Sequence, residues 1–297
     1  MMYDRIVIPV DGSEEAERAA RRGLELARRF GAAADVLYVA DRAVVELGSS
    51  ADETDRLREV GGVVLAEVET FAADLGVPTT TTLLEGDPTT QICEYVRDRD
   101  ASLVVLGGRP LAGLGRRLLG GVSERVLHRS DVPVLVVPSG EGDRAADYER
   151  VLLLTDGSEE SRAGVRHAVA FAECYGASVD VLNVVDLQAA SGVFAAGGLD
   201  EAFVERLEAR GQRSAGRFAA DVEDLAPSVS VDSDVVTTRS FEGVAPAIRE
   251  YVEERDVDLV VTSTHGRSNV GRHLRGSVAS SLFRTLDVPV LVVRRGT

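Results

Sequence analysis

The 297-residue chain contains no lysine and no tryptophan, so all 33 of its basic residues are arginines. Without lysine, the chain cannot form a Walker-type phosphate loop, whose lysine reaches the terminal phosphates of a bound nucleotide. Aromatic residues make up 5% of the chain, whereas hydrophobic residues make up 44%. That content is sufficient for packed cores built mainly from Val, Leu, Ala and Ile, and it excludes global disorder.

Cysteine and histidine are also scarce. Cys93 and Cys174 do not occupy matching positions in the two halves of the chain, which argues against a structural disulfide and favours two small buried hydrophobic side chains. The four histidines and two cysteines show no metal-binding spacing, so we expect no metal site.

Long apolar runs are missing as well. None approaches the roughly 20 residues that a membrane span needs, and the segment from Met1 to Val10 has the pattern of a strand rather than of a signal peptide. We therefore expect a cytoplasmic protein with no membrane partner.

Acidic residues dominate the charge of the chain, which has 49 Asp and Glu and a net charge of −16. An acidic surface argues against binding to nucleic acid, whose backbone attracts basic patches. Acidic residues in place of lysine also suit a halophilic cytoplasm, because concentrated salt screens their mutual repulsion. A GC-rich genome would explain the absence of lysine but not the acidity.

The clearest organisational feature is an internal repeat, which matches three segments of the first half with three of the second in the same order. The matching segments are 5–15 (RIVIPVDGSEE) with 150–160 (RVLLLTDGSEE), 31–41 (GAAADVLYVAD) with 176–186 (GASVDVLNVVD), and 131–137 with 287–293, both DVPVLVV. Ser139–Asp147, rich in Gly and charge, has the composition of a linker. The sequence therefore predicts two domains, 1–139 and 148–297.

Within each half, nearly continuous Val/Ile/Leu runs alternate with amphipathic helical patterns such as Glu14–Phe30 and Thr89–Arg99. Such runs indicate strands buried on both faces, and their alternation with helices implies a parallel sheet with right-handed crossovers. Each half is thus expected to be a doubly wound α/β domain with a five-stranded parallel sheet. The expected strands are 5–10, 34–39, 79–84, 103–106 and 134–137 in the first half, and 150–155, 179–184, 229–237, 259–262 and 290–293 in the second.

Ligands of such sheets bind beyond the carboxyl ends of the strands, at the topological switch point. There the first strand of each half is followed by Asp-Gly-Ser, at Asp11 and Asp156. One interpretation is a helix start capped by Asp or Ser. The other is a carboxylate that contacts a ligand, and the two stay open.

The fourth strand of the second half is followed by a loop of small residues. Ser263, Gly266, Gly276 and Ser277 have the spacing small-x2-Gly-x9-Gly-Ser. Small residues allow backbone N–H groups to approach a phosphate closely, and the helix that follows Gly276-Ser277 presents its N-terminal donors to an anion. This pattern predicts a phosphate-binding loop.

The Asp-Gly-Ser turn, the Gly-x2-Gly-x9-Gly-Ser/Thr loop and the terminal Val-Pro-Val-Leu-Val-Val strand together resemble the universal stress protein family, twice over essentially the whole chain. The resemblance implies two tandem Rossmann-like domains and, in the nucleotide-binding branch of the family, ATP or another adenine nucleotide at the glycine loop, with or without Mg²⁺. It places Asp156 at the ribose and the backbone of Val184, at the end of the second strand, at adenine. The residues implied around the phosphates are Thr262, Ser263, His265, Gly266, Gly276, Ser277 and Val278.

The first half departs further from this pattern than the second. Pro110 stands at the second glycine position and removes a backbone donor, and Gly120-Gly121 lacks the hydroxyl. Losing two contacts to a charged group, each worth roughly 1–3 kcal/mol, lowers affinity by orders of magnitude. We therefore predict nucleotide binding mainly in the second half. The weaker site implied for the first half comprises Asp11, Val39, Gly107, Gly120 and Gly121.

The second half also carries about eleven extra residues, which we place within Gln188–Gly211. Their paired glycines fit a lid over the nucleotide, and a surface loop leading into a helix at Asp200–Arg210 fits equally well.

No catalytic constellation is visible, so we expect a nucleotide-binding regulatory or stress-response protein rather than an enzyme, with at most slow ATP hydrolysis. Two alternatives stay open: a hydrolase of the related adenine-nucleotide hydrolase-like group, and an interaction module that binds no nucleotide. Pro133 and Pro289 mark the last strand of each half as a sheet edge. Because family members pair through this strand, an intramolecular pseudo-dimer is expected, and a homodimer of chains stays open.

The charge balance leads to a prediction about salt. We expect the free energy of unfolding to be markedly lower in dilute buffer than in about 1 M KCl, where the screening length is roughly 3 Å. Denaturant titrations at the two salt concentrations measure this difference. Full stability in dilute buffer would contradict a halophilic adaptation.

Overall fold

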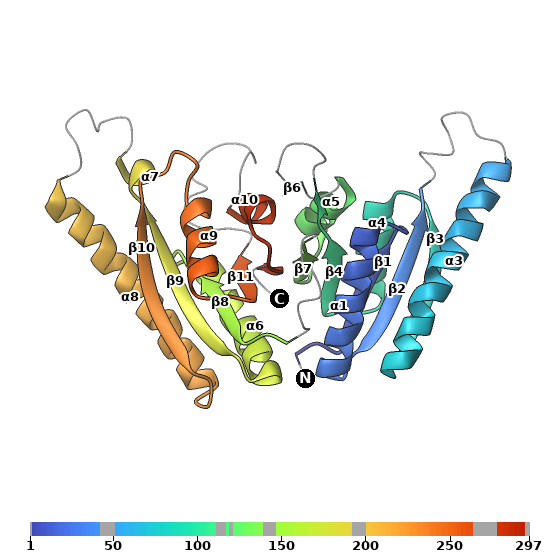
Figure 1. Ribbon diagram of the computed structural model, residues 1–297, viewed down its shortest axis with the longest axis horizontal. Helices are drawn as coiled ribbons and strands as arrows, with labels where there is room; N and C mark the ends of the chain where they lie inside the picture. The colour runs from blue at the N-terminus through green and yellow to red at the C-terminus, as the bar shows by residue number, and fades with distance from the viewer. Residues whose placement is uncertain are drawn as a thin grey trace. The chain divides into compact units, whose positions relative to one another are not determined.

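The computed structural model describes residues 2–41, 51–110, 117–118, 121–138, 147–191, 200–263 and 278–294 (Figure 1). The chain divides into two compact units, Met1–Ala146 and Asp147–Thr297. Each unit contains a five-stranded parallel sheet with helices on both faces, so the predicted fold class is confirmed.

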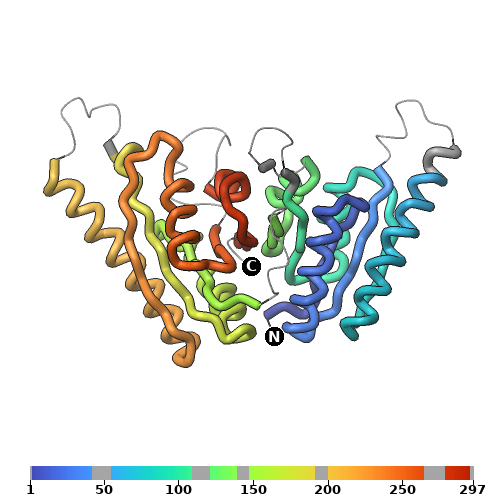
Figure 2. Tube along the Cα trace, in the orientation of Figure 1, coloured from blue at the N-terminus to red at the C-terminus, as the bar shows by residue number. Residues whose placement is uncertain are grey.

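In the first unit the strands lie in the order β7-β4-β1-β2-β3, and all neighbours are parallel. Helices α1 and α3 pack together on one face, where Figure 2 shows them side by side, and α4 and α5 pack together on the other. The strands are β1 (Arg5–Val10), β2 (Ala33–Ala40), β3 (Thr79–Glu85), β4 (Leu103–Gly107) and β7 (Val134–Val137). The helices are α1 (Glu14–Phe30), α3 (Ala51–Leu75), α4 (Pro88–Asp98) and α5 (Gly121–Arg129).

The second unit repeats this topology in the order β12-β11-β8-β9-β10. Helices α6 and α8 share one face, and α9 packs against α10. The strands are β8 (Arg150–Leu154), β9 (Ser178–Asp186), β10 (Val231–Thr238), β11 (Leu259–Ser263) and β12 (Val290–Val293). The helices are α6 (Glu159–Tyr175), α7 (Leu187–Ser191), α8 (Glu201–Leu225), α9 (Ala245–Glu254) and α10 (Val278–Thr285).

Two features differ from the sequence prediction. The second strand of the second unit continues to Asp186, so Val184 is not its last residue. In the first unit, the segment after β4 forms a short antiparallel pair of β5 (Arg109–Pro110) and β6 (Arg117–Leu118), with Pro110 opposite Arg117. Proline is compatible with this small sheet because an edge strand does not require its missing N–H donor.

Burial on both faces explains the continuous apolar runs of the central strands. Ile6, Val7 and Ile8 are successive residues of β1 whose side chains point to alternate faces, and all three are fully buried. Only a sheet covered by helices on both sides buries such a run. Of the cysteines, Cys93 is buried and Cys174 partly exposed, and no disulfide joins them.

An ion pair at the start of the second strand recurs in both units. The guanidinium of Arg5 donates to both carboxylate oxygens of buried Asp35 at 2.9 and 3.0 Å. In the second unit Arg150 donates to Asp180 at 3.1 and 3.4 Å. A buried carboxylate requires such a partner, because leaving it uncompensated costs several kcal/mol. The pair ties the first strand of each unit to the second.

Close packing between sheet and helix requires a glycine at the end of β4. A Cβ atom on Gly107 would lie 2.5 Å from the carbonyl oxygen of Glu15 in α1. This contact is a structural reason for a glycine that the sequence had assigned to a weak nucleotide site.

Replacing that glycine yields a stability prediction. Gly107→Ala is expected to lower the free energy of unfolding by about 1–3 kcal/mol, because the backbone of α1 must move. Gly62→Ala is the matched control: Gly62 lies in α3 with nothing within 4 Å of its added Cβ, so helix propensity should stabilise that variant by roughly 0.5–1 kcal/mol. Urea titrations compare the two, and equal effects would rule out the close contact.

A buried histidine makes stability depend on pH. His167 in α6 is 2% exposed, and burial, assisted by the charge of Arg166, lowers its pKa to about 4. The unfolded chain takes up this proton below about pH 6.5, whereas the folded protein does so only near pH 4. The stability from neutral His167 is therefore fully present above pH 6.5 and is lost as the pH falls toward 4.

The His167→Leu variant should lack this part of the acid sensitivity. We expect its free energy of unfolding to fall by up to about 3 kcal/mol less than that of the parent between pH 6.5 and 4. Exposed His128 in α5 provides the control variant His128→Leu, which should follow the parent. Identical pH profiles for all three proteins would contradict a depressed pKa at His167.

Candidate functional site

The described part of the candidate site in the second unit lies at the carboxyl ends of β8, β9 and β11. Strand register pairs Leu154 with Leu182 and Leu153 with Val261. Asp156 lies two residues after Leu154, and Val184 lies two residues after Leu182. Ser263 lies two residues after Val261. The structure thus brings Asp156, Val184, Thr262 and Ser263, predicted from three separate segments, to one edge at the topological switch point.

The turn after β8 holds the carboxylate of Asp156 in a defined orientation. Its Oδ1 accepts hydrogen bonds from the backbone N–H of Ser158 at 3.0 Å and from the Ser158 hydroxyl at 2.5 Å. Gly157 between them has φ 76°, a conformation that favours glycine. Ser158 in turn caps α6 by accepting from the N–H of Ser161 at 3.2 Å.

The first unit repeats this turn at Asp11. Its Oδ1 accepts from the N–H and the hydroxyl of Ser13 at 3.0 and 2.5 Å, and Ser13 caps α1. Serine is therefore the capping residue of the first helix in each unit, and the aspartate two residues earlier supports the cap.

Beneath the turn, the second unit has a buried polar network. Thr155 Oγ1 accepts from the N–H of Gly157 at 3.0 Å and lies 3.1 Å from the hydroxyl of Ser161. The Asn183 side-chain amide donates to the carbonyl of Thr155 at 2.7 Å. Thr155, Ser161 and Asn183 are each less than 9% exposed, and hydrogen bonds in such surroundings hold their groups firmly. The network fixes both ends of the turn that carries Asp156.

The first unit cannot form this network. Val10, Ala16 and Tyr38 stand where the second unit has Thr155, Ser161 and Asn183. Burial raises the pKa of the Tyr38 phenol, and the nearby Asp11 carboxylate raises it further. The network was not predicted from the sequence. A comparison of the two copies could have indicated it, because the second has three polar residues at positions that are apolar or aromatic in the first.

The first unit also gathers some of its predicted residues. Val10 pairs with Tyr38 in the register of β1 and β2, so Asp11 and Val39 follow at the same level. Gly107 ends the neighbouring strand β4, and Ser123 donates to its carbonyl at 3.3 Å. Gly121 is the first residue of α5, and Gly120 lies outside the described residues.

The predicted phosphate loop of the second unit is described only at its two ends. Thr262 in β11 is 6% exposed. Val278 is the first residue of α10, where the helix N-terminus was expected. His265, Gly266, Gly276 and Ser277 lie outside the described residues, as do residues 192–199 of the predicted segment Gln188–Gly211, whose described ends lie mainly in α7 and α8.

Other kinds of site find no support in the described ranges. Among those residues, no group of three or more His, Cys, Asp or Glu side chains is arranged to hold a metal ion. No helix in the same ranges is both long and apolar enough to cross a membrane.

Comparisons with known proteins agree over the length of the chain. The model of the universal stress protein family matches residues 2–138 and again residues 147–294. A universal stress protein of Mycobacterium tuberculosis is 28% identical over 302 residues, covering 98% of this chain and 97% of that protein. One from Methanocaldococcus jannaschii is 37% identical over 140 residues, covering 46% of this chain and 82% of the relative.

Among solved structures, the crystal structure of a universal stress protein from Archaeoglobus fulgidus covers 100% of both chains with a TM-score of 0.75 at 21% identity, which is a likeness of fold. The family match to both halves extends over far more than half of the sequence. The chain therefore belongs to the universal stress protein family, with two copies of the family domain in tandem.

Proposed function

We propose that this chain is a stress-response regulatory protein that binds an adenine nucleotide, with ATP as the expected ligand, mainly in its second unit. The observation that carries the proposal is the buried network of Thr155, Ser161 and Asn183 under the Asp156 turn. A ligand pays less to bind a turn that is already held in place. The equivalent turn of the first unit has no such support from Val10, Ala16 and Tyr38.

The difference in loop chemistry points in the same direction. The second unit has Gly266 and the Gly276-Ser277 pair, whereas the first has Pro110 and Gly121 at the second glycine and hydroxyl positions. Pro110 is paired with Arg117 in the β5–β6 sheet. A segment occupied by this pairing and lacking one N–H offers fewer donors to a phosphate.

In the proposed complex the Asp156 carboxylate accepts hydrogen bonds from the ribose hydroxyls, and the backbone of Val184 meets the adenine edge. The loop from Thr262 to Val278 surrounds the phosphates, whose charge Mg²⁺ would partly neutralise. Donors at the start of α10 face the same anion. The chain has no Walker lysine, so we propose a binding role with at most slow ATP turnover.

Calorimetric titration with MgATP tests the assignment to one unit. We expect one site per chain, and Asp156→Ala should weaken it about 10- to 100-fold, the loss of one hydrogen bond to a charged group. Asp11→Ala is the matched control, since it removes the same turn from the first unit and should leave the affinity unchanged. Asp156→Asn retains an oxygen for the Ser158 hydrogen bonds, so a loss of affinity in that variant reflects the missing charge rather than a disrupted turn.

Several outcomes would contradict the proposal. Two equivalent sites per chain, or a larger loss from Asp11→Ala than from Asp156→Ala, would refute the assignment to the second unit. No binding of ATP, ADP, AMP or a cyclic nucleotide would favour an interaction module. Steady-state turnover in the ordinary enzyme range of about 1–10³ per second would favour a hydrolase.

A further inference from the structure

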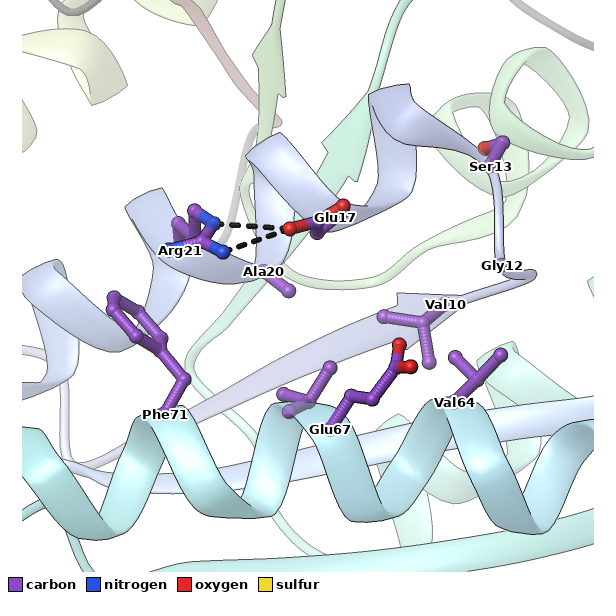
Figure 3. A pocket seen from close by; sticks show the side chains of 10 residues that line it. Val10, Gly12, Ser13, Glu17, Ala20, Arg21, Val64, Glu67 and Phe71 are labelled. Carbon is purple, nitrogen blue, oxygen red and sulfur yellow. Dashed lines mark hydrogen bonds and ion pairs between the residues drawn. The ribbon is translucent and has the colours of Figure 1, made fainter.

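The first unit contains a cavity of about 100 Å³ between α1 and α3, on the face of the sheet that these helices cover (Figure 3). Its walls are mainly apolar, and they come from the end of β1, one side of α1 and the facing side of α3. The apolar lining residues are Val10, Ala20, Val64, Val68 and Phe71. One end of this cavity reaches Gly12 and Ser13 in the turn after β1, whereas the nucleotide is proposed mainly in the second unit.

The second unit has larger side chains at two of the positions that line this cavity. Gly12 lies close to Val64, and in the second unit Gly157 lies close to Ser214 in the same way. Likewise, Gly61 lies close to Tyr38, and Gly211 lies close to Asn183. These contacts align α3 with α8, so Phe218 corresponds to Val68, and the repeat aligns Val165 with Ala20. Phe218 and Val165 are 4% and 2% exposed.

A polar contact also closes the space in the second unit. Arg162 in α6 donates to Asp221 in α8 at 2.5 Å, which joins the two helices directly. The corresponding residues of the first unit are Glu17 and Phe71, which cannot form an ion pair. The two copies of the scaffold therefore differ in both side-chain size and charge at this place.

The rim of the cavity is polar and carries a net negative charge. Arg21 is engaged: it donates to Glu17 at 2.8 and 3.2 Å and lies 4.7 Å from the centre of the Phe71 ring. Glu67 reaches from α3 toward Val10 in Figure 3, and within the described residues no hydrogen bond or ion pair involves its carboxylate. The rim thus carries two carboxylates, those of Glu17 and Glu67, and one guanidinium, that of Arg21, which is already paired.

We propose that this cavity is a binding site for a small primary amine with an apolar group of about three carbons. The size follows from the volume, because a cavity of about 150 Å³ holds benzene and one of 100 Å³ holds a group about two thirds as large, such as isopropyl. The apolar group displaces water from the Val, Ala and Phe walls, and the ammonium stays at the exposed rim beside Glu67. A carboxylate ligand is disfavoured there by Glu17 and Glu67.

Titration of the full chain with isopropylamine, followed by backbone amide NMR shifts, tests the site. We expect saturable shifts confined to amides around Gly12, Ala20 and Val64–Phe71. The alcohol propan-2-ol should bind more weakly, and 2-methylpropanoate more weakly still. Equal binding of all three compounds, or shifts spread over the whole surface, would overturn the proposal.

Variants drawn from the second unit supply the decisive control. The double variant Ala20→Val/Val68→Phe fills the cavity with the residues that occupy it in the other copy and should abolish the localised shifts while the fold is retained. If the double variant does not fold, Ala20→Val alone should weaken binding by at least ten-fold. Unchanged affinity in a folded filled variant would refute the site.

The charge of the rim is tested on its own. Glu67→Gln should weaken amine binding about five-fold, as expected for loss of an exposed ion pair, and leave alcohol binding unchanged. Glu69→Gln removes an exposed carboxylate from the same helix outside the cavity lining and should have no effect. Equal effects of the two variants would show a general charge effect and contradict recognition by Glu67. None of these results depends on nucleotide binding.

Discussion

Burial of the central strands on both faces is the constraint from which the rest of each unit follows. A strand such as β1, with three successive fully buried residues, is stable only between two layers of helices. Helices on both faces are reached by crossover connections, and each strand–helix–strand crossover leaves its two strands parallel. Parallel strands end at one edge, so residues far apart in sequence, such as Asp156 and Ser263, meet there.

Duplication of this scaffold left some interactions unchanged in the two units. The Arg5–Asp35 and Arg150–Asp180 ion pairs and the Asp-Gly-Ser turns have nearly the same geometry in both units. They tie the first strand to the second and start the first helix in each copy. Residues with such a role are poor guides to which copy binds a ligand.

The two units differ in what lies behind these shared features. Beneath the turn, the second unit has hydrogen-bonded Thr155 and Asn183 where the first has Val10 and Tyr38. Between the helices, the second unit has Phe218 where the first has Val68 and a cavity. One copy thus has a hydrogen-bonded network beneath its strand-end aspartate, and the other has a cavity between its helices. The tandem consists of two units with the same topology and different internal chemistry.

The amino-acid sequence by itself determined the repeat, the α/β class, the parallel sheets and most strand limits, because buried runs and turn residues are local signals. It also placed Asp11 and Asp156 at strand ends. Only the tertiary structure decided which serine caps each helix, that Gly107 is needed by the backbone of α1, and that Thr155, Ser161 and Asn183 form one network. Those properties depend on contacts between segments distant in sequence, and periodicity carries no information about which side chains such contacts bring together.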